Sequence, residues 1–368
     1  RHDPDPGTTP TPARPRHDPT PARARHRHEP GYRRGVPSLS PAIAEVRRAV
    51  RASLSALPSG STVIVALSGG PDSLALAAAT AFEAPKLSLR AASLTVDHGL
   101  QPGSDEVALT AARAAAGLGL DPLVVRVEVG TAGGPEAAAR DARYGVLRDA
   151  ARDANAAAVL LGHTLDDQAE TVLLGLARGA GATRLAGMAP ARTDDDSGVR
   201  WLRPLLGVRR ETTLAACAAA GLDPWLDPHN HDDRFRRVRV RERVLPLLEA
   251  ELGPGVAEAL ARTAEQLRED AQAFDDMIAE TIEDIVEPAE AGIAISVAAL
   301  AANPPALRHR IIRLVVQSEF HESLTRSQTL EVARLVTDYS GQGPIDLPGC
   351  RARRVGRLIE FSAGGSGA

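Results

Sequence analysis

The sequence predicts an α/β fold, in which a doubly wound parallel sheet is followed by a second, mostly helical domain. Two observations lead to this prediction. Short apolar strands alternate with helical patterns over roughly the first half of the chain, which is typical of a parallel sheet with helices on both faces. From about Gly253 the pattern changes to long helices that are rich in alanine, glutamate and arginine.

The alternation begins with a helix that we expect from about Pro41 to Leu57, because its apolar residues recur at helical spacing. The expected strands of the sheet are Thr62–Leu67, Leu87–Val96, Pro122–Val129 and Ala157–Leu161. The expected helices that follow them are Ser73–Phe82, Ser104–Ala116, Glu136 to about Asn155, and Leu165–Ala177. Ligands of such sheets bind beyond the carboxyl ends of the strands, so the segments that follow the strands are the place to look for a site.

The second domain is expected to consist mainly of the helices Val256–Ile285, Pro304–Gln317 and Ser327–Thr337, with two short strands at Gly343–Leu347 and Arg354–Phe361. We place the α/β domain at 38–250 and the mostly helical domain at 251–368. Residues 1–37, with nine prolines and scattered arginine and histidine, are expected to be a disordered tail. This tail could serve as a weak electrostatic arm that contacts nucleic acid, or it could be an extension without a function.

The composition excludes several kinds of chemistry. Lys86 is the only lysine, and no Schiff-base or Walker-type motif surrounds it. The two cysteines, Cys217 and Cys350, stand far apart, which leaves too few ligands for a thiolate-bound cluster and fits a reducing, cytoplasmic setting. No uninterrupted apolar run approaches the ~20 residues that would span a bilayer, so we expect no membrane partner.

The strongest motif is Ser68-Gly69-Gly70-Pro71-Asp72-Ser73, which follows the first expected strand directly. Small residues let the backbone turn so that its N–H groups approach an anion, and Ser73 opens a helix whose dipole favours phosphate. The motif matches neither the Walker pattern nor the dinucleotide-binding pattern of glycines. Although an ordinary glycine turn is the plainer alternative, the motif predicts a nucleotide phosphate site.

A second group of polar residues follows the fourth expected strand. Asp167 and Glu170 stand at i, i+3, which places both carboxylates on one helical face; Asp166 with Glu170 is the i, i+4 alternative. Clustered carboxylates repel one another, so the group predicts a bound cation, either Mg²⁺ or an amine. A charged, solvated start of a helix is the alternative. His163, next to this group, is expected to take part.

Three further segments carry candidate residues. Arg140, in Glu136–Arg140, could bind a phosphate through its guanidinium fork or be a surface arginine. Asp97 and His98, at the end of the second expected strand, could border a nucleotide or cap the following loop. The stretch 234–243 supplies six arginines, which could contact RNA phosphates or form the solvated face of a helix.

The motif at residues 68–73 resembles the SGGxDS loop of the N-type ATP pyrophosphatases, which implies a sheet of the adenine nucleotide alpha-hydrolase type. The motifs VDHGL, EAAARxxRY and GHxxDDQxET, in this order, together resemble the tRNA(Ile)-lysidine synthases. The resemblance covers roughly residues 60–250 and includes Arg178–Gly181, Gly187-Met188, Arg203–Leu206, Trp225-Leu226-Asp227, Asn230 and Pro246–Leu248. This chain has Thr164, Arg184 and Val238 where the family often has histidine, glycine and asparagine.

The resemblance implies a ligase that adenylates the wobble cytidine of tRNA(Ile) with a CAU anticodon and joins free L-lysine to it, releasing AMP and pyrophosphate. It implies ATP and Mg²⁺ as cofactors, and it leaves a homodimer open. The resemblance implies catalytic roles for Asp72, Arg140, His163 and Asp167, and metal binding by Asp72 and Asp167. It also implies that Asp167 and Glu170 bind lysine and that Arg237 and Arg241 contact tRNA. The alternatives are another adenylating enzyme with the same loop, such as a tRNA thiolase or an amide-forming synthetase, and a non-catalytic nucleotide- or tRNA-binding protein.

Overall fold

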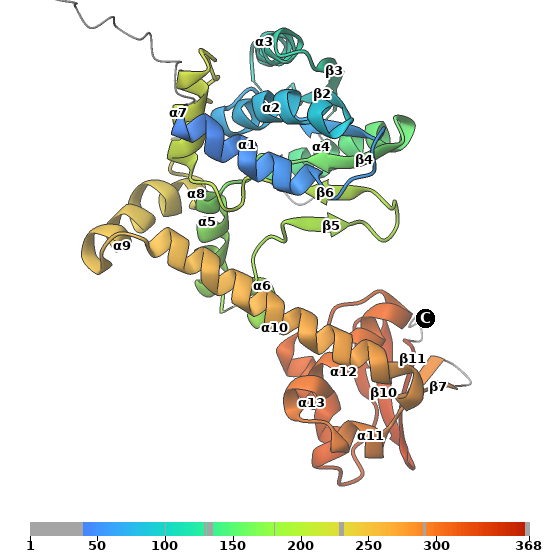
Figure 1. Cartoon of the computed structure of the whole chain (residues 1–368). Helices are drawn as coiled ribbons and strands as arrows, with labels where there is room; N and C mark the ends of the chain where they lie inside the picture. Colours follow the sequence, from blue (N-terminus) through green and yellow to red (C-terminus); the bar gives the residue numbers. More distant parts are fainter. Residues whose placement is uncertain are drawn as a thin grey trace, which may run out of the picture. The chain divides into compact units, whose positions relative to one another are not determined.

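The computed structural model describes residues 40–99, 101–128, 130, 135–179, 181–227, 232–289 and 292–364. The expected tail at 1–37 therefore lies outside the described residues, as do Leu100, Ala180 and Asn230 of the motifs above. The described residues from Ser40 onward form two sheets with their helices (Figure 1). Among these residues, no helix combines the length and the apolar composition that a membrane crossing requires.

The first sheet has six strands in the order β3-β2-β1-β4-β6-β5. They are β1 Thr62–Ala66, β2 Arg90–Asp97, β3 Asp121–Arg126, β4 Ala156–Leu160, β5 Ala191–Thr193 and β6 Arg200–Leu202. All neighbours are parallel except β5, which pairs antiparallel with β6. The strand order reverses between β1 and β4, and in such sheets a ligand crevice opens at this point. The expected parallel sheet is confirmed, and β5 and β6 are additional strands that the sequence pattern did not reveal.

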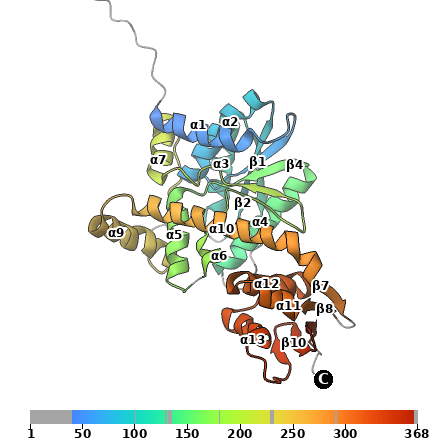
Figure 2. The same ribbon diagram turned by 60° about the horizontal axis from the view of Figure 1, so that its bottom comes forward.

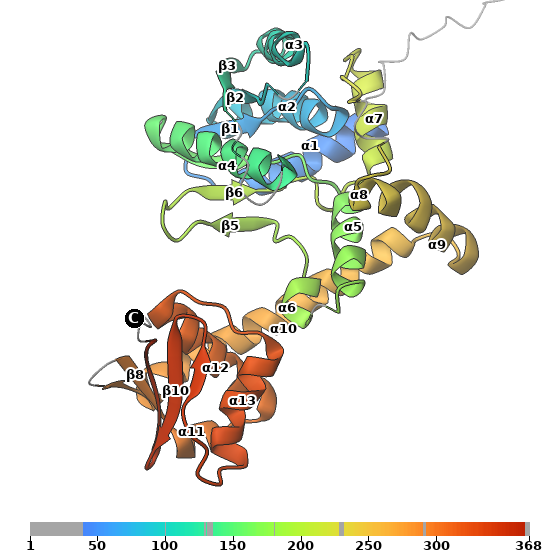
Figure 3. The same ribbon diagram turned by 180° about the vertical axis from the view of Figure 1, so that it is seen from behind.

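Helices cover both faces of this sheet (Figures 1 and 3). The helices α1 Pro41–Leu54, α2 Pro71–Glu83, α3 Ser104–Gly117 and α7 Arg210–Ala219 share one hydrophobic core with the sheet. The helix α4 Pro135–Asp153 contributes Leu147 to a second core. Strand β1 shows why both cores form: Val63 and Val65 enter the first, while Ile64 points to the opposite face and enters the second.

The helix α5 Leu165–Leu176 follows β4, and the long helix α10 Val256–Ile285 packs against it and against α6 Ala182–Leu185 (Figure 2). The bounds of α10 are those expected from the sequence. Arg268 of α10 donates hydrogen bonds to the backbone oxygens of Ala186 and Met188 at 2.8 and 2.9 Å. Between α7 and α10 lie α8 Arg236–Arg239, a π-helical segment Val240–Val244 and α9 Leu245–Leu252.

The expectation of a mostly helical C-terminal domain is wrong, because this region contains a five-stranded antiparallel sheet of order β7-β8-β11-β10-β9. Its strands are β7 Val286–Ala289, β8 Gly292–Ser296, β9 Ile345–Leu347, β10 Cys350–Val355 and β11 Leu358–Ala363. They pack with α11 Val297–Ala302, α12 Pro305–Phe320 and α13 Arg326–Thr337 around a separate core.

The single strand expected at 354–361 is instead a hairpin, whose turn contains Gly356 at a φ of +59°. On β10, exposed arginines at 351 and 353 alternate with the buried side chains of Cys350 and Ala352. This strand has few large apolar residues, so its period of two is a weak signal. Its buried side chains share a core with Phe361 of the adjacent strand β11 and with Ile295 of β8, which pairs with the other edge of β11.

Candidate functional site

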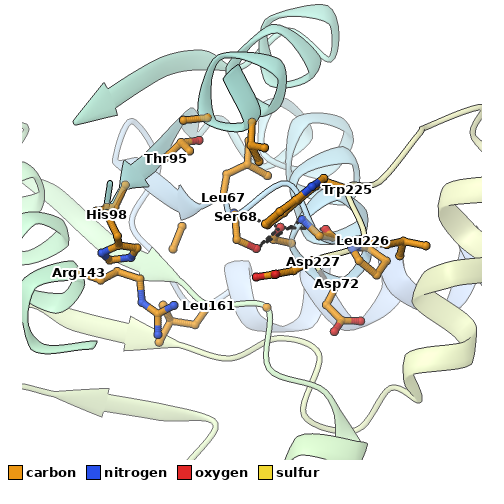
Figure 4. A pocket seen from close by; sticks show the side chains of 18 of the residues that line it. Leu67, Ser68, Asp72, Thr95, His98, Arg143, Leu161, Trp225, Leu226 and Asp227 are labelled. Carbon is orange, nitrogen blue, oxygen red and sulfur yellow. Dashed lines mark hydrogen bonds between the residues drawn. The ribbon is translucent and has the colours of Figure 1, made fainter. Parts of the chain in front are cut away.

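A cavity of about 900 Å³ opens beyond the carboxyl ends of β1, β2 and β4, where the strand order reverses (Figure 4). Several segments that are distant in the sequence line it, namely Ala66–Ser68, Gly70–Ser73, Leu94–His98, Arg143-Tyr144, Leu161–His163 and Trp225–Asp227. The side chains of Asp167, Arg210 and Arg241 complete one of its ends. The expected phosphate loop and the expected acidic group therefore face one cavity.

The loop Ser68–Ser73 turns at Gly69, whose φ of +82° is accessible mainly to glycine. Ser73 closes the loop: its Oγ accepts a hydrogen bond from the backbone N–H of Ser68 at 3.2 Å and donates one to the backbone oxygen of Gly70 at 3.0 Å. Helix α2 then begins at Pro71, so the positive end of its dipole borders the cavity. This arrangement fits the phosphates of a nucleotide.

Gly162, after β4, packs directly against this loop. A Cβ atom at residue 162 would lie 3.2 Å from the backbone C atom of Asp72 and from the backbone N atom of Ser73. Because these neighbours are backbone atoms, a larger residue at position 162 would require the phosphate loop to shift by a few tenths of an ångström. The approach brings the segment that contains His163 and Asp167 next to the phosphate loop.

The acidic group around Asp167 is buried and paired with arginines. Oδ2 of Asp167 accepts hydrogen bonds from the backbone N and Oγ1 of Thr164, at 2.8 and 3.0 Å, and so caps α5. Oδ1 of Asp167 accepts hydrogen bonds from Arg210 at 2.7 Å and Arg241 at 3.4 Å. Glu170, whose side chain is 0% exposed, accepts a hydrogen bond from Nε of Arg241 at 2.7 Å. In this structure the expected cation is therefore supplied by guanidinium groups of the protein.

Arg210, at the start of α7, is a site residue that the sequence analysis did not single out. Its guanidinium reaches Oδ2 of Asp72 at 3.5 Å, Oδ1 of Asp167 at 2.7 Å and Oε1 of Glu170 at 3.3 Å. Thr213, one turn further along α7, donates a hydrogen bond to the other oxygen of Asp72. No local pattern identifies Arg210, because its acidic partners lie 138, 43 and 40 positions away in the sequence.

The pKa values of the two aspartates in this group, Asp72 and Asp167, are shifted in opposite directions. Burial raises the pKa of Asp72, although the hydrogen bond from Thr213 and the charge of Arg210 oppose the rise. Burial also acts to raise the pKa of Asp167, but the charge of Arg210 and the backbone N–H of Thr164 outweigh it, so that this pKa is lowered. Asp167 therefore remains ionised at a lower pH than Asp72 does.

His163 lies in the same buried environment. Burial lowers its pKa to about 4, although the charge of Asp167 acts in the opposite direction. The imidazole is therefore neutral at neutral pH. Nδ1 of His163 has no hydrogen-bond partner among the described residues, and the same holds for Nδ1 of His98 and Oγ1 of Thr95, which also line the cavity. Buried polar atoms without a protein partner fit a ligand that offers hydrogen bonds.

Arg143, and not Arg140, lines the cavity, next to His98 (Figure 4). Arg143 and Leu147 both line it from α4, whereas Arg140 lies over the ring of Tyr144 and donates a hydrogen bond to its hydroxyl at 3.3 Å. Burial lowers the pKa of Arg143, and no carboxylate within the described ranges forms an ion pair with it. A largely buried guanidinium without an acidic partner fits an anionic ligand such as phosphate.

Arg237 and Arg241, for which tRNA contact stays a prediction, lie near Glu170 in this structure. Nε of Arg237 lies 3.8 Å from Oε2 of Glu170, and its Nη2 donates a hydrogen bond to Thr171 at 3.2 Å. The reason is packing, since the π-helical segment that contains Arg241 lies against α5. The neighbouring Arg234 and Arg243 form exposed ion pairs with Asp232 and Asp233 instead.

One other expected residue, Asp97, has a structural contact. Asp97 accepts a hydrogen bond from the backbone N–H of Gly99 at 2.9 Å, as expected if it caps the loop after β2. Asp72 and Asp167, the expected metal ligands, share Arg210 as described above. Within the part of the chain that the structure describes, no group of three or more His, Cys, Asp and Glu side chains has a geometry suited to a metal ion.

Cys217 lies beneath the phosphate loop, where its thiol donates a hydrogen bond to the backbone oxygen of Pro71 at 3.3 Å. Burial raises the pKa of this thiol to about 11, so it is protonated at neutral pH. Cys350 belongs to the core of the C-terminal sheet. The proximity of Cys217 to the loop was not expected from the sequence, but a protonated, lone thiol does not support a sulfur-transfer reaction.

Comparisons with known proteins agree with the fold. Residues 43–248 match a family model described as "PP-loop domain". Residues 295–358 match a second family model, described as "TilS substrate binding domain". Among solved structures, the U34-tRNA thiolase NcsA from Methanococcus maripaludis aligns with a TM-score of 0.53 at 20% identity, over 62% of this chain and 80% of that one. At this identity the likeness concerns the fold alone.

Sequence relatives are much more similar. The chain is 60% identical over 307 residues to a tRNA(Ile)-lysidine synthase of Leifsonia xyli subsp. xyli, which covers 83% of this chain and 91% of that protein. It is 52% identical over 324 residues to a tRNA(Ile)-lysidine synthase of Thermobifida fusca, which covers 87% and 97% of the two chains. With this extent of identity over nearly the whole length of its relatives, the chain belongs to the tRNA(Ile)-lysidine synthase family.

Proposed function

We propose that this protein adenylates the wobble cytidine of tRNA(Ile) with a CAU anticodon and then joins free L-lysine to that base. The observation that carries this proposal is that the phosphate loop 68–73 lies close to the acidic pair of Asp167 and Glu170: the loop and Asp167 line one cavity, and the buried Glu170 shares Arg210 with Asp167. The first can bind the phosphates of ATP and the second an ammonium group. A reaction that joins a nucleotide-activated group to an amine needs both.

In the first step the 2-carbonyl oxygen of the cytosine attacks the α-phosphorus of ATP, and pyrophosphate leaves. The backbone N–H groups of the phosphate loop and the first turn of α2 stabilise the charge that develops on pyrophosphate. Arg143, which has no acidic partner within the described residues, would bind the phosphates, in the role that the sequence analysis gave to Arg140. Asp72, at the start of α2, is the residue that would hold Mg²⁺, and bound Mg²⁺ would neutralise phosphate charge.

In the second step the side-chain amine of lysine attacks the activated carbon of the base, and AMP leaves with the former carbonyl oxygen. Asp167 and Glu170 would bind the ammonium form of that amine before it loses a proton. His163 is neutral, with its pKa lowered to about 4, so it can pass the proton on but does not retain it at neutral pH. Arg237 and Arg241 now occupy part of this acidic site and would turn toward phosphates when RNA binds.

The proposal is tested by the products that the protein forms. Incubation with tRNA, ATP and lysine, followed by mass analysis of the wobble nucleoside, should show lysidine. Pyrophosphate should appear only when tRNA is present, and a tRNA with uridine in place of the wobble cytidine should give none. Pyrophosphate release driven by a small carboxylic acid would support an amide-forming synthetase, and no release in any mixture would support a binding protein.

Two parts of the proposal concern assembly and setting. The homodimer that the sequence left open is tested by light scattering of the protein with and without tRNA. The cytoplasmic setting rests on the cysteines alone and stays a prediction.

A further inference from the structure

Arg210 connects the two ends of the cavity. Its partner Asp72 belongs to the start of α2, beside the phosphate loop, whereas its partners Asp167 and Glu170 belong to α5. The guanidinium uses its Nε, Nη1 and Nη2 for these three carboxylates, and its own side chain is 18% exposed. The backbone N–H of Arg210 donates a hydrogen bond to Oδ2 of Asp166 at 2.7 Å, which anchors the start of α7 to α5.

Three largely buried carboxylates in such proximity repel one another unless a cation lies between them. Arg210 contacts all three, whereas Arg241 contacts only Asp167 and Glu170. Without Arg210, Asp72 would have no ion pair with any of the described residues. The backbone contact of Gly162 with the phosphate loop fixes how closely the two segments approach, and Arg210 links their carboxylates through side-chain ion pairs.

We propose that Arg210 is a positioning residue for both steps of the reaction, because its guanidinium sets the separation between Asp72 and the pair formed by Asp167 and Glu170. The inference rests on the proposed function, which assigns ATP and Mg²⁺ to the side of Asp72 and lysine to the other side. Arg210 itself needs no contact with the reacting atoms. It holds the carboxylates at the spacing that lets the amine meet the adenylated base.

The experiment compares the full-length wild-type protein with the variants Arg210→Gln and Arg210→Lys. Two rates are measured across the acid and neutral pH range: tRNA-dependent pyrophosphate release without lysine, and incorporation of lysine. Arg209→Gln is the matched control, because Arg209 is the N-cap residue of the same helix and pairs with Asp166 and Glu258, neither of which lines the cavity. The titratable and charged groups that contact Arg210 or its partners are Asp72, Asp166, Asp167, Glu170, His163, Arg209, Arg237, Arg241 and Cys217.

We expect Arg210→Gln to lower both rates by about a hundredfold at neutral pH, since misplacement by about 1 Å can have that effect. The acid limb of both pH profiles should also move to higher pH, because Asp167 loses the positive charge that lowers its pKa. Arg210→Lys retains the positive charge but cannot reach three carboxylates with separate nitrogen atoms, as the guanidinium does. The acid limb of its pH profiles should therefore match the wild type, while its rates should lie between those of Arg210→Gln and the wild type. Arg209→Gln should leave the rates and the limb unchanged.

Two results would overturn the inference. The first is that the rates of Arg210→Gln stay within about twofold of the wild type. The second is that both Arg210 variants lose the same share of activity while the acid limb does not move, as a purely structural role predicts. If Arg210→Gln does not fold, the rates of Arg210→Lys test the inference. Full wild-type rates in Arg210→Lys would show that the reaction does not require a guanidinium that contacts all three carboxylates. A wild-type protein that forms no lysidine at all would instead defeat the proposed function.

Discussion

Nε of Arg241 lies 2.7 Å from Oε1 of Glu170, a carboxylate whose side chain is completely buried at the cavity end of α5. Arg210 and Arg237 approach the same carboxylate at 3.3 and 3.8 Å. A buried carboxylate surrounded by guanidinium groups is held in place by these ion pairs. Under the proposed function, the ammonium group of lysine would replace one of the arginines at Glu170.

Glu170→Gln should raise the KM for lysine by more than about tenfold while it changes tRNA-dependent pyrophosphate release by less than about twofold. The neutral amide retains the size of the side chain but cannot pair with an ammonium group, and the first step does not involve lysine. The free energy of unfolding should fall by about 1–3 kcal/mol, because the three arginines lose a charged acceptor. Steady-state kinetics and urea denaturation measure the two effects. Equal losses in both steps would show that Glu170 is not specific to lysine.

Gly162→Ala should weaken ATP binding by about tenfold or more and leave the fold intact. The new Cβ would lie 3.2 Å from backbone atoms of Asp72 and Ser73, so the phosphate loop would have to shift. Calorimetric titration with ATP measures the affinity. Gly207→Ala is the control, because a Cβ at residue 207 would meet nothing within 4 Å. Unchanged affinity in Gly162→Ala would mean that the phosphates bind away from this loop.

His163 should make the stability of the protein depend on pH between about 4 and 6.5. Its folded-state pKa is lowered from 6.5 to about 4, so in this range the unfolded chain binds a proton that the folded protein does not. The free energy of unfolding should therefore rise with pH across this window, by up to about 2–3 kcal/mol from this residue. Denaturation of the wild type and of His163→Gln at several pH values isolates the effect. Parallel curves for the two proteins would contradict the lowered pKa.

Gln168→Ala should lower the free energy of unfolding by about 2–3 kcal/mol. The buried side-chain amide of Gln168 accepts a hydrogen bond from the backbone N–H of Met188 at 2.8 Å and donates one to its backbone oxygen at 3.0 Å. Both Met188 groups would lose this partner in the variant. Urea denaturation measures the loss, and Gln272→Ala, which removes an exposed side chain of α10, should change stability by less than about 0.5 kcal/mol. A similar small effect in Gln168→Ala would show that water replaces the amide.

The features that the sequence predicted well are those that depend on neighbouring residues. The phosphate loop 68–73 could be identified because small residues, a preceding apolar strand and a following helix are contiguous in the chain. Asp167 and Glu170 share a helical face because their spacing requires it. The helix Val256–Ile285 has the predicted bounds because its apolar residues repeat with helical period throughout. The sequence by itself also determined the family, through the order of several such local motifs.

Only the tertiary structure decided which charges meet. The sequence offered several acidic candidates and many arginines, but it did not indicate that Arg210, 138 positions from Asp72, would pair with both Asp72 and the carboxylates of α5. Nor did it distinguish Arg143 from Arg140, since that choice depends on which face of α4 packs on the sheet. The C-terminal sheet was predicted only in part, as two short strands, because its strands are stabilised by partners far along the chain. Such pairings depend on packing between distant segments, and local patterns of residues do not encode them individually.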